Sequence, residues 1–200
     1  MGAVKEWGVT LEEIDGIVTA RPSLRGMLFG YVNEYKLAQI WFSDQRFTEL
    51  KKYDNHDRLH KGDISFHYRG FEISVESKGL QTNSVREVPG GYIGRFQCDA
   101  SDRRPITLPN GESLETTCLL VGQFDLIAVG LFEFGKQWRF AFAKNKDLPR
   151  SAARKYTPEQ RQYLLAGTMD ITWPLKAPFE LEPFRLLDEI VEEKESLLKM

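Results

Sequence analysis

Two short hydrophobic runs that alternate with polar residues, joined at a glycine, most constrain the fold of this chain. Between residues 62 and 78, apolar side chains occupy every second position of both runs, at Ile64, Phe66 and Tyr68 and then at Phe71, Ile73 and Val75. A period of two is typical of a strand with one buried face. Arg69-Gly70 between the runs suits a two-residue turn, because Gly adopts a positive φ easily. The segment therefore predicts an antiparallel hairpin with Tyr68 opposite Phe71.

The predicted register places three charged side chains on one face of the hairpin. Asp63 lies directly opposite Glu76, and Lys78 shares their face because it follows Glu76 by two residues. Opposed residues in an antiparallel pair have Cβ atoms about 4.5–5.5 Å apart, so two carboxylates there repel each other. A divalent cation removes this repulsion, and carboxylate oxygens are ligands that Mg²⁺ takes. An ordinary ion-pair cluster on the surface of a sheet is the alternative interpretation.

The pattern of Asp63 and Glu76-Ser77-Lys78 resembles the PD-(D/E)XK nuclease superfamily, which has the restriction-endonuclease-like fold. The resemblance covers this short motif and the order of elements around it. It implies that Asp63 and Glu76 bind a catalytic Mg²⁺ ion, which Mn²⁺ can replace, and that Lys78 positions or activates the attacking water. One departure is visible, because Gly62 stands where the family has a proline, although that proline is often missing in the superfamily.

A third metal ligand is implied by the same resemblance. In many members of the superfamily an acidic residue on the first helix joins the metal shell. Glu34 lies on the helix predicted here, one residue from its apolar stripe. The resemblance therefore implies Glu34 as a metal ligand beside Asp63 and Glu76, and a solvent-facing helical glutamate is the alternative.

The remaining sequence fits one mixed domain that spans residues 1–200. At this length, 42% apolar residues are enough for a globular core. Apolar spacing predicts helices over 22–42, 151–166 and 184–200, and strands over 95–98, 106–108, 116–118, 124–134 and 138–143. Residues 43–62 and 79–95 and the polar run 99–105 are expected to be irregular.

This order of elements predicts an α/β (α+β) fold, a central mixed β-sheet flanked by helices. It matches the restriction-endonuclease-like core, which we place at about residues 24–143. A helical C-terminal extension follows over about 151–200.

A DNA-binding surface has to be a local basic patch, because the net charge of the chain is −2. Arg103 and Arg104 lie in the polar run and are candidates for phosphate contact or for reading guanine. Gln81 follows Lys78 by three residues and is a candidate for phosphate contact. A charged loop and a capped turn are the plain alternatives.

A second basic stretch follows the last strand of the predicted core. Lys144, Lys146 and Arg150 gather there, and this is the strongest candidate for a phosphate-contacting patch in the sequence. The same residues also suit a solvated surface, and the two interpretations stay open.

Histidine and cysteine residues give weaker signals. His56 and His60 are four residues apart, which suits zinc on a helix, contact with phosphate or simple solvation. Cys98 and Cys118 lack metal-type spacing and are expected to be reduced and buried.

Together these features predict a Mg²⁺-dependent DNA endonuclease, in the form of a homodimeric type II restriction enzyme that acts on double-stranded DNA. A repair or junction-resolving nuclease, or a nuclease subunit of a defence system, is the alternative within this class. A non-catalytic nucleic-acid-binding protein of the same fold is the alternative outside it. The N-terminus has no apolar signal core and no apolar run reaches membrane length, so a soluble cytoplasmic protein without membrane contact is expected.

Overall fold

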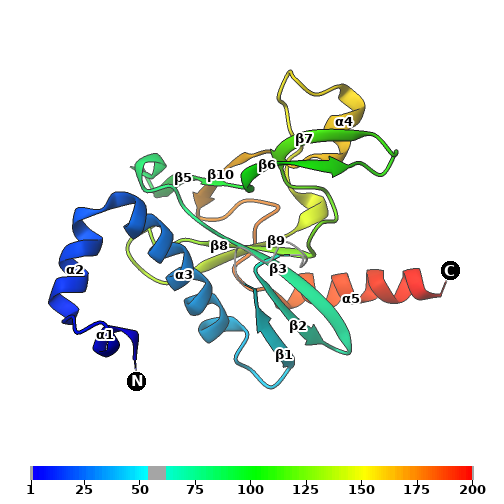
Figure 1. The fold of residues 1–200 in the computed structure, drawn as a ribbon. Coiled ribbons are helices and arrows are strands. Elements are labelled where there is room, and N and C mark those ends of the chain that lie inside the picture. The colour runs from blue at the N-terminus through cyan, green and yellow to red at the C-terminus, as the bar shows by residue number, and fades with distance from the viewer. Residues whose placement is uncertain (1, 54–61, 200) are drawn as a thin grey trace.

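The computed structural model describes residues 2–53 and 62–199, and Figure 1 shows their arrangement. The helices are α1 (Ala3–Glu6), α2 (Leu11–Ala20), α3 (Pro22–Trp41), α4 (Pro158–Tyr163) and α5 (Phe184–Leu198), with 3₁₀ turns η1 (Thr82–Ser84) and η2 (Asn145–Asp147). The strands are β1 (Phe47–Lys52), β2 (Ile64–Tyr68), β3 (Phe71–Gly79), β4 (Arg86–Val88), β5 (Gly91–Gln97), β6 (Asp99–Thr107), β7 (Ser113–Cys118), β8 (Leu126–Gly130), β9 (Phe140–Lys144) and β10 (Thr168–Trp173).

A five-stranded sheet in the order β1-β2-β3-β8-β9 forms the centre of the fold. Its strands pair antiparallel except for β3 and β8, which run parallel. The sheet is therefore mixed, and its middle strand is β3. The predicted fold class, a mixed α+β domain with a central mixed sheet flanked by helices, is confirmed.

The central sheet is covered on both faces, as β8 shows most clearly. Leu126 and Ala128 of β8 pack in a core with residues of α3 and α5, whereas Ile127 and Val129 pack with residues of β5 and β10. The two helices thus cover one face, and a small sheet in the order β10-β5-β4 covers the other. All five residues of β8 are buried, as its unbroken apolar sequence predicts.

The hairpin of β2 and β3 has the predicted register. Tyr68 pairs with Phe71 and Ile64 with Val75. Arg69 and Gly70 both adopt positive φ, 50° and 85°, as a tight hairpin turn requires.

The residue before Asp63 must be glycine in this backbone. Gly62 has φ of 74°, and a Cβ atom there would lie 2.7 Å from the carbonyl oxygen of Val75. Proline is locked near a φ of −65°, so it could not adopt this conformation. The local backbone therefore accounts for the departure from the proline of the family pattern.

Several expected irregular segments are strands instead. The run 99–105 belongs to β6, and β1, β4 and part of β5 lie in segments expected to be loops. Their residues are mostly polar, so the sequence lacks the apolar alternation that reveals a half-buried strand. Cross-strand hydrogen bonding to β2, β5 and β7 defines them.

The expected helix over 151–166 is wrong at both ends. Only α4 is helical, and it begins after Thr157, whose side chain forms a capping box with Gln160. On the N-terminal side of α4, the Ser151 N–H donates to the Leu164 carbonyl. On the C-terminal side, Leu164 is extended and forms a β-bridge with Leu120. The chain after residue 150 is also not wholly helical, because β10 joins the small sheet. Helix α5 follows its predicted apolar spacing, and α2 begins with a capping box formed by Thr10 and Glu13.

No helix in residues 2–53 and 62–199 is long and apolar enough to cross a membrane.

Candidate active site

Asp63, Glu76 and Lys78 meet in one cleft with a volume of about 1160 Å³. The Lys78 ammonium lies 2.7 Å from Oε1 of Glu76. One carboxylate oxygen of Asp63 accepts a hydrogen bond of 2.7 Å from the Ser77 N–H, which lies between the other two site residues. The predicted convergence of the three side chains is therefore present.

Burial and like charge raise the pKa of two carboxyl groups here. Burial is the larger cause that raises the pKa of Asp63 to about 6, and the Glu76 carboxylate adds to it. Burial also raises the pKa of Glu34 to about 7, with Asp63 as the next cause. These two carboxyl groups resist ionisation in the absence of a cation. A cation bound next to them would stabilise their charged form.

Lys78 is a cation in this site. Burial alone would lower the pKa of Lys78, but the carboxylates of Glu76 and Asp63 outweigh burial and raise it. A lysine held charged in this way donates hydrogen bonds and does not accept a proton. Beneath it lies the buried thiol of Cys98, whose pKa burial raises to about 12.

A buried polar contact fixes α3 against the strand that carries the site. The Asn33 side-chain amide donates to Oγ of Ser77 at 3.0 Å and to the Lys78 carbonyl at 3.3 Å. Gly130 leaves room for this amide, because a Cβ atom there would lie 1.8 Å from Oδ1 of Asn33. The contact places Glu34, the next residue on α3, at the edge of the site.

The chemistry of the donor set suits a hydrated Mg²⁺ ion. No group of three or more His, Cys, Asp or Glu side chains in the described ranges could hold a metal ion by itself. Mg²⁺ needs no such cage, because it keeps several waters and takes one or two carboxylates plus substrate phosphate oxygens. The adjacent Asp63 and Glu76 carboxyl groups, with Glu34 further out, fit that mode of binding.

Two of the predicted nucleic-acid contacts lie in the same cleft. Gln81 and Arg104 both line it. Arg103 is exposed on β6 but is not part of the cleft lining. Neither guanidinium makes a hydrogen bond or ion pair with another residue of the described ranges.

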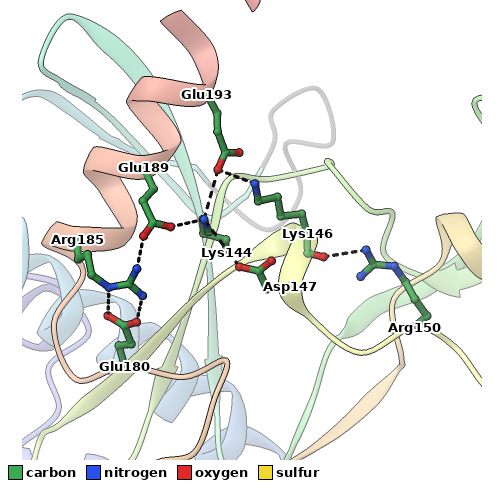
Figure 2. Close-up of polar contacts among 8 residues, drawn as sticks. All are labelled: Lys144, Lys146, Asp147, Arg150, Glu180, Arg185, Glu189 and Glu193. Carbon is green, nitrogen blue, oxygen red and sulfur yellow. Dashed lines mark hydrogen bonds and ion pairs between the residues drawn. The ribbon is translucent and has the colours of Figure 1, made fainter. Parts of the chain in front are cut away.

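The other predicted basic patch is already paired, as Figure 2 shows. Lys144 is buried and contacts Glu189 and Glu193 of α5, the second at 3.3 Å. Lys146 pairs with Glu193 at 2.5 Å. The Arg150 guanidinium donates to the backbone carbonyls of residues 148 and 146 at 2.5 and 2.8 Å. Each of these three cations already has a partner within the chain. Their contact with DNA stays a prediction.

Several cleft residues carry no recognisable motif. They are polar side chains contributed by the ends of β5 and β6 and by the loop before β8, namely Gln97, Asp99, Ser101 and Gln123. Only the tertiary fold brings these residues to the same cleft as Asp63, Glu76 and Lys78. Asn33 is buried between α3 and β3, and it lies outside the apolar spacing that predicted this helix.

The predictions for His56 and His60 fall outside the described residues. Cys98 and Cys118 are free and buried, as expected.

No protein-family model and no curated protein matches the chain. Among solved structures, a bacterial homing endonuclease is similar to it at 16% sequence identity, with 69% of this chain and 87% of that chain covered. The TM-score is 0.38, which is too low for the likeness to decide fold or activity. The case for a function therefore rests on the geometry of the site.

Proposed function

We propose that this chain is a Mg²⁺-dependent endonuclease that hydrolyses phosphodiester bonds of double-stranded DNA, in the role of a type II restriction enzyme. The observation that carries the proposal is the convergence of Asp63, Glu76 and Lys78 in a large cleft. A cluster with perturbed pKa values in a cleft is a sign of a functional site. A merely structural ion pair needs no cleft above it.

The chemistry of phosphodiester hydrolysis assigns a role to each residue. A bound Mg²⁺ ion supplies Lewis-acid polarisation of the phosphate and lowers the pKa of a coordinated water. Asp63 and Glu76 would hold this ion through their carboxylates, with Glu34 as a further acidic side chain at the edge of the site. Lys78 donates hydrogen bonds to the attacking water or to a phosphate oxygen, and its charge opposes the negative charge that grows on the phosphate.

A homodimer is part of the proposal, because cutting both strands of a palindromic target needs two sites related by a two-fold axis. Helix α5 does not offer its apolar stripe for that interface. Its apolar residues Leu186, Leu187, Ile190 and Val191 are buried against the central sheet. The mass of the unmodified chain in sedimentation equilibrium tests this part, and the mass of one chain would contradict it.

Cleavage of plasmid and phage DNA with Mg²⁺, Mn²⁺ or EDTA tests the activity. Glu76→Gln and Lys78→Ala should each lower the cleavage rate about 100-fold or more, because each removes a group next to the reacting phosphate. Glu72→Gln is the matched control. It lies on the same strand and face as Glu76 but is exposed and outside the cleft, so this variant should cut at the wild-type rate.

Two outcomes contradict the proposal. One is cleavage that continues in EDTA. The other is a Glu76→Gln variant that cuts at the wild-type rate with Mg²⁺.

A further inference from the structure

Strands β6 and β7 form a ribbon that pairs with no third strand in the described part of the chain. One side of the ribbon is anchored in a small core with Cys118, Tyr156 and Leu164. Residues of both strands, among them Arg104 and Thr117, also line the cleft that holds Asp63, Glu76 and Lys78. Two strands lie about 4.8 Å apart, and a ribbon of this width fits the major groove of B-DNA, about 12 Å wide.

The backbone of β6 holds Arg104 in a defined place at this border. Arg104 pairs with Thr116, which is fully buried and whose hydroxyl lies 2.5 Å from that of Tyr156. The pairing of β6 with β7 shifts register between Asp99 and Arg104. Such irregularities re-aim side chains, often beside active sites.

Neighbouring arginines of β6 point to opposite sides, since side chains alternate along a strand. Arg104 is half-buried and lines the cleft, whereas Arg103 is exposed and does not. Arg104 therefore faces any duplex bound over the catalytic residues. Its guanidinium has no hydrogen-bond or ion-pair partner among the described residues, so it is available to a ligand.

The cleft wall around Arg104 mixes hydrogen-bond donors and acceptors. Gln97 and Ser101 can do both, Asp99 accepts, and Arg104 donates. Phosphate oxygens only accept, and a carboxylate repels them, so a wall built for phosphate alone would not include Asp99. Base edges in the major groove present both donors and acceptors.

We propose that the β6–β7 ribbon enters the major groove of the DNA substrate and that β6 reads its bases, with Arg104 as the principal specificity-determining residue. The inference rests on the proposed function and deepens it. Arg104 discriminates between base pairs through its planar fork of donors, which fits guanine O6 and N7. Arg103, on the far side of the strand, contacts only the sugar-phosphate backbone.

Selection from a random duplex library tests this role without cleavage. The Lys78→Ala chain, which keeps both metal ligands, selects DNA in Mg²⁺, and the enriched duplex is then titrated beside a scrambled one. Adding Arg104→Ala should lower the affinity ratio of enriched to scrambled duplex about tenfold or more. Arg104→Lys should lower that ratio as well, because lysine keeps the charge but not the fork. Thermal melting of each variant checks that it is folded.

Arg103→Ala is the matched control, one residue away on the opposite face. It should leave the ratio unchanged, with at most an equal loss of affinity for both duplexes. If both Arg104 variants leave the affinity ratio of enriched to scrambled duplex unchanged, Arg104 does not read bases. The proposed nuclease function would still stand. A chain that cuts DNA but enriches no sequence would likewise overturn the reading role and leave that function standing. A chain that neither binds nor cuts any duplex overturns the proposed function, and the reading role with it.

Discussion

Lys78 and Lys144 both lie among carboxylates on strands of the central sheet, yet their surroundings differ. Lys78 contacts Glu76 in an open cleft, and its side chain is 20% exposed. Lys144 contacts Glu189 and Glu193 beneath α5, and its side chain is 10% exposed. The first cluster has room for a substrate beside the charges, whereas the helix closes over the second (Figure 2).

The carboxyl groups of the two clusters also shift in opposite directions. Burial and like charge raise the pKa of Asp63 beside Lys78. A hydrogen bond from Lys144 lowers the pKa of Glu189, and bonds from Lys146 and Lys144 outweigh burial to lower that of Glu193. The carboxylates under α5 are thus stabilised in their charged form by Lys144 and Lys146. In the cleft, Lys78 alone does not offset the burial and mutual repulsion of Asp63 and Glu76. This difference separates a structural lysine, Lys144, from Lys78, the lysine that we propose to be catalytic.

The largest expected effect in the closed cluster is on stability. Lys144→Met keeps the length of the side chain but leaves Glu189 and Glu193 without their buried cation. We expect the free energy of unfolding to fall by about 2 kcal/mol. Urea denaturation measures the loss, and cleavage per folded molecule should stay at the wild-type value. A Lys144→Met chain that is fully folded but inactive would break the distinction between the two clusters.

The next effect concerns DNA binding at different salt concentrations. Lys146 and Arg150 are paired within the chain, so Lys146→Ala and Arg150→Ala should change the slope of log affinity against log salt by much less than ~0.9, the value for one lost phosphate contact. Titration of one duplex at several salt concentrations gives the slope. A change of about 0.9 for each variant would restore the prediction from sequence that these residues contact phosphate.

The smallest expected effect is a shift in melting temperature with Mg²⁺. The ion should raise the midpoint by about 5 °C at concentrations well above its dissociation constant. Glu76→Gln should abolish this shift, Glu34→Gln should reduce it less, and Glu189→Gln should leave it intact. Loss of the shift in Glu189→Gln would place the metal under α5.

The same shift should depend on pH in a defined direction. The pKa of Asp63 is raised to about 6 in the folded chain, above its unfolded value, so ionisation of this group destabilises the fold as pH rises toward and past 6. Mg²⁺ offsets that cost and competes with protons for the same oxygens. The gain in melting temperature should therefore be larger at pH 8 than at pH 5.

The sequence predicted the local parts of the site well. Alternation on both sides of Arg69-Gly70 set the register of β2 and β3 from Tyr68 and Phe71 to Ile64 and Val75. Asp63 comes just before β2, and its N–H donates to the Val75 carbonyl, next to Glu76 in the chain. The apolar spacing over residues 22–42 marked α3. All of these signals lie within one element or one tight turn, where spacing alone determines geometry.

The partners of each cation could not be predicted in the same way. Glu189 lies 45 residues after Lys144, and only the docking of α5 joins them. Strand β6 has a polar sequence that looks like a loop, and its pairing with β7 is what makes it a strand. Charge clusters in a sequence thus show where cations gather, but not whether the fold has already neutralised them.

The position of β3 in the sheet has a consequence for how the molecule loses its functions on heating. As the middle strand, β3 exchanges hydrogen bonds with β2 and β8, so its amides open only when the whole domain unfolds. The β6–β7 ribbon has two strands and a small core of its own, and such ribbons are only marginally stable by themselves. The strand that carries the proposed catalytic residues belongs to the most cooperative unit of the fold, and the ribbon to a unit that can melt first. Near the melting temperature, the geometry of the proposed catalytic site would then outlast the proposed discrimination between sequences.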